Sequence, residues 1–179
     1  MTPNDYIQLK AFARVDGLWL ALLWIASFSF YILGLATPGY SLLALLLAFS
    51  TPLLVWKRLK NFRDFGLDGH ISFLRGWAYI ILLFFYGSLL FAIAQFCYFY
   101  YLDQGYLLSM YTQMISLPEN AAVIKEAGLQ QMLDEALNTL GAMRPIDLSL
   151  NMLTTNMMLG VIVGMPIAGL LRRKVNVES

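Results

Sequence analysis

The stretch that decides the fold runs from residue 76 to residue 102 and reads GWAYIILLFFYGSLLFAIAQFCYFYYL. No charged residue interrupts it between Arg75 and Asp103. A helix needs about 20 predominantly apolar residues to cross the hydrocarbon core of a bilayer. As one helix this stretch would be about 40 Å long, roughly 10 Å more than the core, so it must tilt or protrude. Its closing run of tyrosines from Tyr98 predicts the aromatic belt at one membrane surface.

Two more stretches lack charge, one between Asp16 and Lys57 and one between Asp147 and Arg172. The first is long enough for two crossings, and Pro38-Gly39 marks the turn between them because proline and glycine end helices. We therefore expect an all-α polytopic membrane protein, a single integral membrane domain over residues 1–179, with spans at about 17–36, 40–57, 76–102 and 148–171.

Composition supports the same class of protein. Hydrophobic residues make up 59% of the 179 residues, charged residues only 13%, and the mean hydropathy is +0.65. Soluble domains carry about 25% charged residues, so a water-facing shell cannot be built here. A soluble domain, a disordered chain and a nucleic-acid-binding module are excluded as classes. The single cysteine, Cys97, excludes an internal disulfide and a cysteine-built metal site.

The basic residues predict the orientation, because they are retained on the cytoplasmic side. The 103–147 connection contains only two of them, Lys125 and Arg144, beside six acidic residues. We expect that connection outside the cell, and both termini and the 58–75 loop in the cytoplasm. A cleaved signal peptide is the competing interpretation of the first span, which is long for one and contains two tryptophans. The other ten basic residues are Lys10, Arg14, Lys57, Arg58, Lys60, Arg63, Arg75, Arg172, Arg173 and Lys174.

The outer segment, residues 103–147, is too long for a simple link. Ser116 and Glu119 are spaced as a capping box, with Ser116 as the N-cap. From Leu129 to Leu140 apolar residues recur at helical spacing, opposite an acidic polar face. These features predict one amphipathic helix of about 20 residues on the outer surface, with a bend at Gly128. Its acidic face disfavours anionic lipid headgroups and favours a lid over the bundle or a partner surface.

Apart from Lys57 at the very end of the second, the expected spans contain no Asp, Glu, Lys, Arg or His, which argues against a proton-coupled transporter. His70 is the only histidine; it lies near Asp64 and Asp68 with a spacing that matches no known motif. Cys97, in an aromatic run with no base nearby, is typical of a buried small apolar residue. The sequence therefore predicts no catalytic residue, no metal site and no cofactor.

The fourth expected span carries small residues four positions apart, with an asparagine one turn earlier. Such a face lets helix backbones approach closely, either within one chain or between copies or partner proteins. We interpret it as a helix-packing or oligomer face made of Asn156, Gly160, Gly164 and Ala168.

Basic residues cluster at the cytoplasmic ends of the second and third spans. They either hold the loop inside or bind lipid phosphates, at about 1 kcal/mol each near an anionic leaflet. The candidates for lipid phosphate contact are Lys57, Arg58, Lys60, Arg63 and Arg75.

Three segments together resemble a bacterial family of four-helix inner-membrane proteins, catalogued as domain of unknown function 4199. The resemblance implies a four-span bundle in a two-membrane envelope, and it supplies no catalytic or binding residue. The resemblance also implies that members of the family accompany envelope glycosyltransferase genes. The segments are Asp68-Gly69-His70-Ile71-Ser72-Phe73, residues 98–105, and Arg144-Pro145-Ile146-Asp147 with Gly160 and Pro166-Ile167-Ala168.

Three functions follow as hypotheses. The first is a non-enzymatic accessory or interaction protein of the bacterial cell envelope, in the inner membrane, contacting lipids and a membrane protein or a second copy. The second is a small transporter or lipid-handling protein that acts as an oligomer. The third is a membrane enzyme on a lipid phosphate, using His70. Candidate residues for lining a transport cavity are Tyr31, Ser88, Gln95, Asn151, Thr155 and Asn156.

Overall fold

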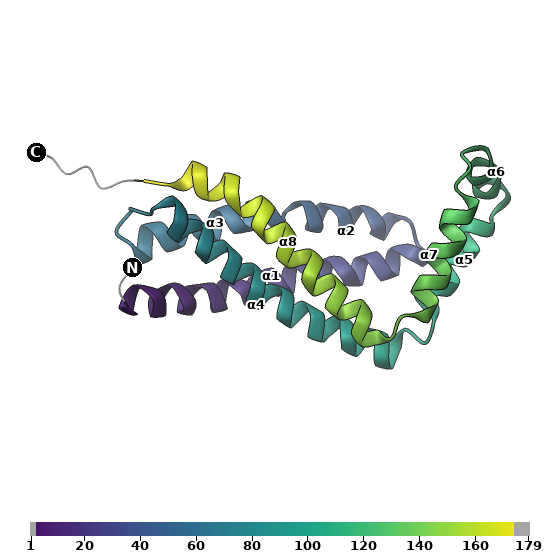
Figure 1. Cartoon of the computed structure of the whole chain (residues 1–179), viewed down its shortest axis with the longest axis horizontal. Helices are drawn as coiled ribbons and strands as arrows, with labels where there is room; N and C mark the ends of the chain where they lie inside the picture. Colours follow the sequence, from purple (N-terminus) through teal and green to yellow (C-terminus); the bar gives the residue numbers. More distant parts are fainter. Residues whose placement is uncertain (1–2, 174–179) are drawn as a thin grey trace, which may run out of the picture.

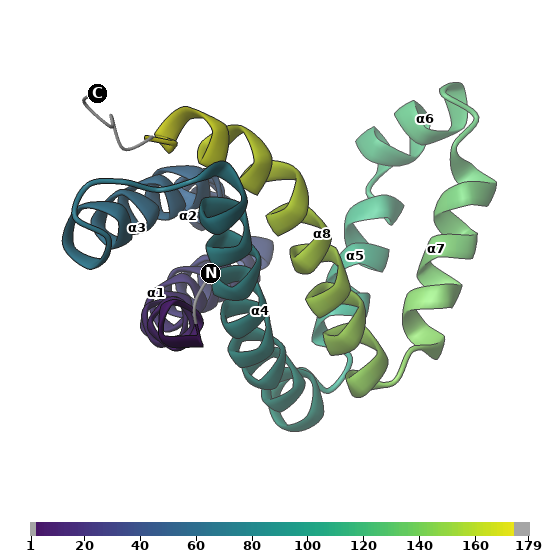
Figure 2. The same ribbon diagram turned by 60° about the vertical axis from the view of Figure 1, so that its left-hand side comes forward.

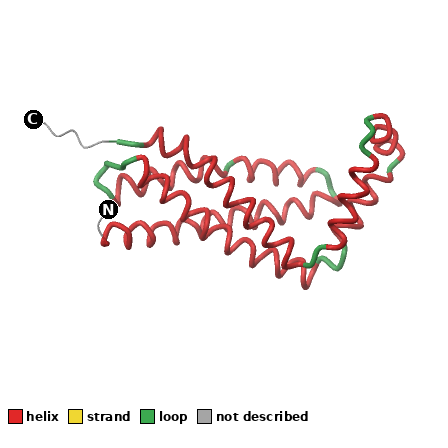
Figure 3. The backbone as a smooth tube through the Cα atoms, viewed as in Figure 1, coloured by secondary structure: helices red, strands yellow, loops and turns green. Residues whose placement is uncertain are grey.

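The computed structural model describes residues 3–173, and helices dominate this part of the chain (Figures 1 and 3). Lys174, one of the basic residues used for the orientation, lies outside the described residues. The elements in chain order are α1 (Pro3–Ala36), α2 (Gly39–Phe49), α3 (Thr51–Gly66), α4 (Phe73–Cys97), the π-helical turn η1 (Tyr98–Leu102), α5 (Tyr106–Ser116), α6 (Pro118–Glu126), α7 (Gln130–Ala142) and α8 (Pro145–Leu171).

Four helical segments among these residues are long and apolar enough to cross a membrane, as the sequence predicts. They are α1, α2 with α3, α4 with η1, and α8. Figure 1 shows them side by side, with the start of α1 and the end of α8 at one end of the bundle. We call this the terminal end. The opposite end, where α5, α6 and α7 lie, is the hairpin end, and these three helices form the hairpin.

The helices extend beyond the expected spans. The first begins at Pro3 rather than near residue 17, because its charged first turns are compatible with helix outside an apolar core. The second is interrupted at Ser50, and α3 begins with a proline in its first turn, at Pro52. A proline has no N–H to continue the hydrogen bonding of α2, so the helix restarts there.

The expected single helix in the outer segment is wrong. Residues 106–142 form three helices, and α6 and α7 are separated at Gly128, whose positive φ of 68° ends a helix rather than bending it. Ser116 is the last residue of α5 and not an N-cap; its hydroxyl donates to the carbonyl of Thr112. Leu117 takes the N-cap position of α6 without a side-chain hydrogen bond.

The buried core lies in the terminal half of the bundle. The buried apolar residues of α1 run from Leu9 to Trp24, and α3 contributes three more buried ones, Val55, Leu59 and Phe62. In this half α3 packs against α1, α4 and α8. Toward the hairpin end, α2 packs mainly on α1, and α8 mainly on α4, so the α1–α2 pair diverges from the α4–α8 pair (Figure 1).

Helices α1 and α4 cross closely near the middle of the bundle. A Cβ atom on Gly17 would lie 2.7 Å from the Cβ of Tyr86, so only glycine permits this approach. Trp24 then packs against Phe84 and Phe91 of α4, with ring centroids 5.5 and 5.8 Å apart. Between this crossing and the hairpin end, α1 and α4 diverge (Figure 1).

Candidate functional site

The small residues of α8 lie against α4 of the same chain. A Cβ on Gly160 would be 2.5 Å from Cγ of Phe84, and one on Gly164 would be 3.0 Å from Ile80. Ala168 lies opposite Gly76 in the same antiparallel register. The small-residue face of α8 is therefore covered by α4 of the same chain.

The same register places polar groups in the hairpin half of this interface. Continuing it by one helical turn brings Asn156 of α8 opposite Ser88 of α4. Ser88 and Gln95 are at most 1% exposed, and neither Ser88 Oγ, Gln95 Oε1 nor Asn156 Nδ2 has a hydrogen-bond partner within the described residues. Groups of this kind favour interhelical hydrogen bonds or a bound water, because an unsatisfied polar atom is costly when buried.

A buried ion pair lies where α1, α3 and α4 meet in the terminal half. Asp16 is 6% exposed. Its carboxylate accepts a hydrogen bond from the hydroxyl of Tyr79 and lies 3.3 Å from Nη1 of Arg58. The guanidinium of Arg58 also covers the ring of Trp19, and Tyr79 stacks on Phe62. The sequence alone does not indicate this group, because Asp16 stands at the edge of an uncharged stretch and its partners are far away in the chain.

A second basic residue, Arg63, ties α3 to the end of α8. Its side chain is 5% exposed, its Nε donates to Asp64 Oδ1 at 2.7 Å, and its Nη1 donates to the carbonyl of Leu171 at 3.3 Å. A cation at a helix C-terminus is favourable because the terminal carbonyls are partially negative. Ile71 and Arg173 exchange two backbone hydrogen bonds beside it. The terminal end is therefore closed by polar contacts.

The predicted lipid phosphate contacts divide into two groups. Arg58 is paired with Asp16, and Arg63 is paired with Asp64. Nη2 of Arg75 lies 3.2 Å from a carboxylate oxygen of Asp5. Lys57 and Lys60 are exposed on α3. Three of the five cations thus face carboxylates, and the two lysines are the ones open to a lipid phosphate.

The remaining sequence candidates lie apart. His70 is exposed, with Nδ1 2.9 Å from the carbonyl oxygen of Asp68, inside the 67–72 loop. Within residues 3–173 no three His, Cys, Asp or Glu side chains come together as a metal site would require. Cys97 is exposed on α4 rather than buried, because the hairpin half is spread open. The expectation of a buried cysteine is wrong.

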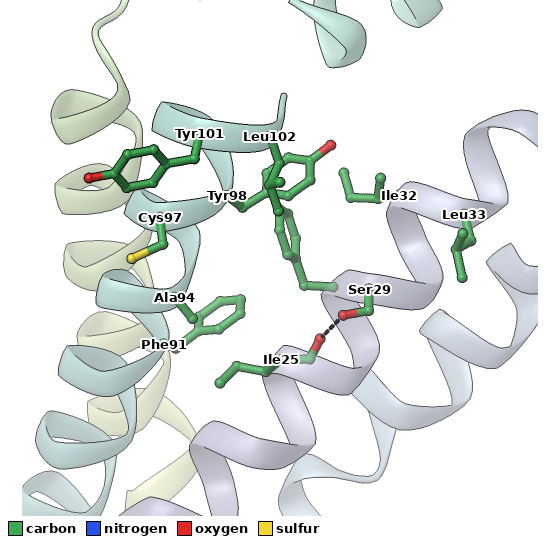
Figure 4. Close-up of a pocket in the computed structure, with 11 residues that line it drawn as sticks. Ile25, Ser29, Ile32, Leu33, Phe91, Ala94, Cys97, Tyr98, Tyr101 and Leu102 are labelled. Carbon is green, nitrogen blue, oxygen red and sulfur yellow. Dashed lines mark hydrogen bonds between the residues drawn. The ribbon is translucent and has the colours of Figure 1, made fainter. Parts of the chain in front are cut away.

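An apolar groove lies between α1 and α4 in the hairpin half. Its volume is about 560 Å³. Figure 4 shows Ile25, Ser29 and Ile32 of α1 on one side, with Phe91 and Ala94 of α4 and Tyr98 of η1 on the other.

None of the six residues suggested for a transport cavity lines the groove. Ser88 and Gln95 are buried, while Asn151 and Thr155 are exposed on α8. The structure therefore places the six at buried and exposed positions outside this groove.

Helix α5 bridges the ends of α1 and η1. Tyr111 of α5 is hydrogen-bonded to Tyr31 of α1 through their hydroxyl groups, and residues 103–105 connect η1 to α5 directly. Partial burial raises the pKa of the Tyr111 phenol above its ordinary value. We call the Tyr31–Tyr111 contact the latch.

Four membrane-length helices around a small buried core define a polytopic α-helical membrane protein. A family model described as "Protein of unknown function (DUF4199)" matches residues 16–173, and the chain belongs to this family. The resemblance noted in the sequence is thereby confirmed. Neither the curated proteins nor the solved structures compared with the chain show significant similarity to it.

Proposed function

We propose that this protein is a non-enzymatic accessory or interaction subunit of a cell-envelope process in the bacterial inner membrane. Both termini face the cytoplasm in this proposal, and the hairpin faces outward. The basic residues of α3 and Arg75 in the first turn of α4 support this orientation, because they lie toward the terminal end. Lys57 and Lys60 then contact lipid phosphates of the cytoplasmic leaflet.

The observation that carries the proposal is the open surface of the hairpin. Figure 2 shows the hairpin standing to one side of the bundle, and its main contact with the bundle is α5 against α1. The hairpin helices α5, α6 and α7 contain one buried residue, Leu107. Apolar side chains between 41% and 64% exposed lie on it: Met114, Leu117, Val123, Leu129 and Met132.

Such a surface suits a protein partner better than lipid. Leu129, the N-cap of α7, and Met132 are exposed, and the acidic Asp134 and Glu135 are exposed on the polar face of the same helix. Apolar groups next to carboxylates match a partner that has an apolar patch rimmed by basic residues, because complementary charge fixes the register of an interface. Anionic headgroups would be repelled by the same carboxylates.

The test is crosslinking in native membranes followed by purification in mild detergent. We expect the wild-type chain to be recovered with a partner protein or a second copy. The double variant Leu129→Gln with Met132→Gln should lose that species, because apolar area leaves the interface. Asn138→Ala, on the polar face of α7, is the matched control and should keep it. Recovery of a lone monomer after crosslinking would end the proposal.

A further inference from the structure

The α1–α4 groove is bounded along the bundle axis and is lined by α1, α4 and η1. Toward the terminal end it stops where Gly17 meets Tyr86 and where Trp24 packs on Phe91. Toward the hairpin end Phe28 of α1 packs on Tyr98 and Phe99 of η1, and neither α2 nor α8 lines the groove. The groove therefore follows the seam between α1 and α4, from the level of Tyr98 to about the middle of the bundle.

Its polarity changes along this direction. Both walls belong to segments of membrane-spanning length, and the inner part is lined by aliphatic and aromatic side chains such as Ile25 and Phe91. The hydroxyl of Ser29 donates to the carbonyl of Ile25 at 2.8 Å, so it offers no free donor to a ligand. The tyrosines lie at the hairpin end of the groove, where the carboxylate of Asp103 lies near the Tyr98 hydroxyl. An apolar interior with a phenolic mouth matches an amphiphile.

The mouth is shaped by an irregular turn. The N–H of Asp103 donates to the carbonyl of Tyr98 at 3.0 Å, five residues back, which is the wider spacing of a π-helix. Single π-turns inside α-helices are rare and frequently occur at functional sites. This one supplies Tyr98, Tyr101 and Leu102 to the groove lining.

The dimensions favour a flexible chain over a protein helix. A partner helix is about 10–12 Å wide with its side chains and needs a seam that stays open along its length. The Gly17 crossing closes this seam halfway. A volume of about 560 Å³ instead lies within the range of small-molecule sites, about 300–1,000 Å³.

We propose that the α1–α4 groove binds one acyl chain of a membrane phospholipid from the leaflet at the hairpin end, with the headgroup near Tyr98 and Tyr101 and the chain end near Trp24. This site is separate from the hairpin surface of the proposed function. Each proposal is therefore tested on its own residues.

The experiment uses the full chain in vesicles of phosphatidylethanolamine and phosphatidylglycerol, with a trace of phosphatidylethanolamine that carries a diazirine at the end of one acyl chain. After photolysis, peptide mass spectrometry maps the adducts. We expect them to concentrate around Trp24 and Phe91 and to be several-fold fewer on exposed stretches of α2 and α8. An even distribution over the lipid-facing surface would overturn the proposal.

Two variants fill the groove from opposite walls. Ala94→Trp adds bulk from α4, and Ser29→Phe adds it from α1; each should reduce the groove adducts several-fold. Ala48→Trp, at an exposed position of α2 outside the groove, is the matched control and should leave them unchanged.

Circular dichroism and gel filtration show which variants fold, and one folded groove variant is enough for the comparison. Unchanged groove adducts in a folded groove variant would refute the acyl-chain site. So would a wild-type groove free of adducts with a change of oligomeric state in Ala94→Trp, because a second protein chain would then occupy it.

Discussion

Asp16 and Gly160 show how single residues hold this bundle together. Asp16 places a charge among α1, α3 and α4, where Tyr79 and Arg58 satisfy it. Removing one partner of such a group leaves a buried charge uncompensated, which is the larger cost. Gly160 acts in the opposite way, because the absence of a side chain lets α8 touch Phe84 of α4. Close backbone approach supplies the dispersion contacts that hold helices together in lipid.

At this scale we predict that Gly160→Ala destabilises the bundle by about 1–3 kcal/mol, because the added methyl group overpacks the contact with Phe84. Gly169→Ala on the same helix is the control, since a Cβ there meets nothing within 4 Å. It should be neutral or stabilising by up to about 1 kcal/mol, as alanine is the better helix former. Unfolding in mixed detergent micelles measures both, and equal losses would contradict the close contact.

Among the elements, the hairpin is attached to the rest of the bundle by few contacts. Gly141 at the end of α7 lies close to Leu108 of α5, so the hairpin is packed within itself. Its link to α1 is the latch, in which Tyr111 is only partly buried. Elements held by few buried contacts are the first to open. We therefore expect the hairpin to separate from α1 before the core of the bundle opens.

For this element we predict that Tyr111→Phe weakens docking of the hairpin by about 0.5–1.5 kcal/mol, the net value of a hydrogen bond. The raised pKa of Tyr111 gives the sign of the pH effect. The latch contribution is complete below the ordinary tyrosine pKa of about 10 and is lost as the pH rises through the raised value. Tyr111→Phe should show a smaller pH response.

Spin-label mobility at Asn138→Cys, in a Cys97→Ser background, reports the docking. Tyr100→Phe is the control, because Tyr100 is 60% exposed. If the label moves equally in wild type and Tyr111→Phe at every pH, the latch does not hold the hairpin.

In the whole molecule, four membrane-length segments put the start of α1 and the end of α8 at the same end. That end also carries the buried core and most of the ion pairs, with the acidic hairpin at the other. In the proposed function, the end with the buried core anchors the protein and the hairpin at the other end makes the contact with a partner.

We predict the orientation from the same arrangement. In a Cys97→Ser background, a membrane-impermeant maleimide applied to intact spheroplasts should label Asn138→Cys on α7. His70→Cys should react only after lysis, because the basic residues around its loop are retained in the cytoplasm. Both positions are exposed. The reverse pattern would invert the orientation, and labelling of both before lysis would contradict a membrane-spanning bundle.

The uncharged stretches determined the number of spans, because hydrocarbon admits long apolar helices and few charges. The family was recognised from three short segments, which begin at Asp68, Tyr98 and Arg144, and the match over residues 16–173 confirms it. The spacing of Gly160 and Gly164 identified a packing face without its partner, since helical periodicity says which residues share a face and not which helix they meet. Gly128 was recognised as irregular, but its positive φ separates α6 and α7.

Only the tertiary structure decided what depends on residues far apart in the chain. The contact of Asp16 with Tyr79 joins helices 63 residues apart in sequence, and Arg63 reaches the carbonyl of Leu171 across 108 residues. The groove exists because α1 and α4 cross at Gly17 and then separate, which is a property of two backbones together. Apolar sequence determines that a helix enters the membrane, whereas side-chain shape at the crossings determines which helices close and where they remain open.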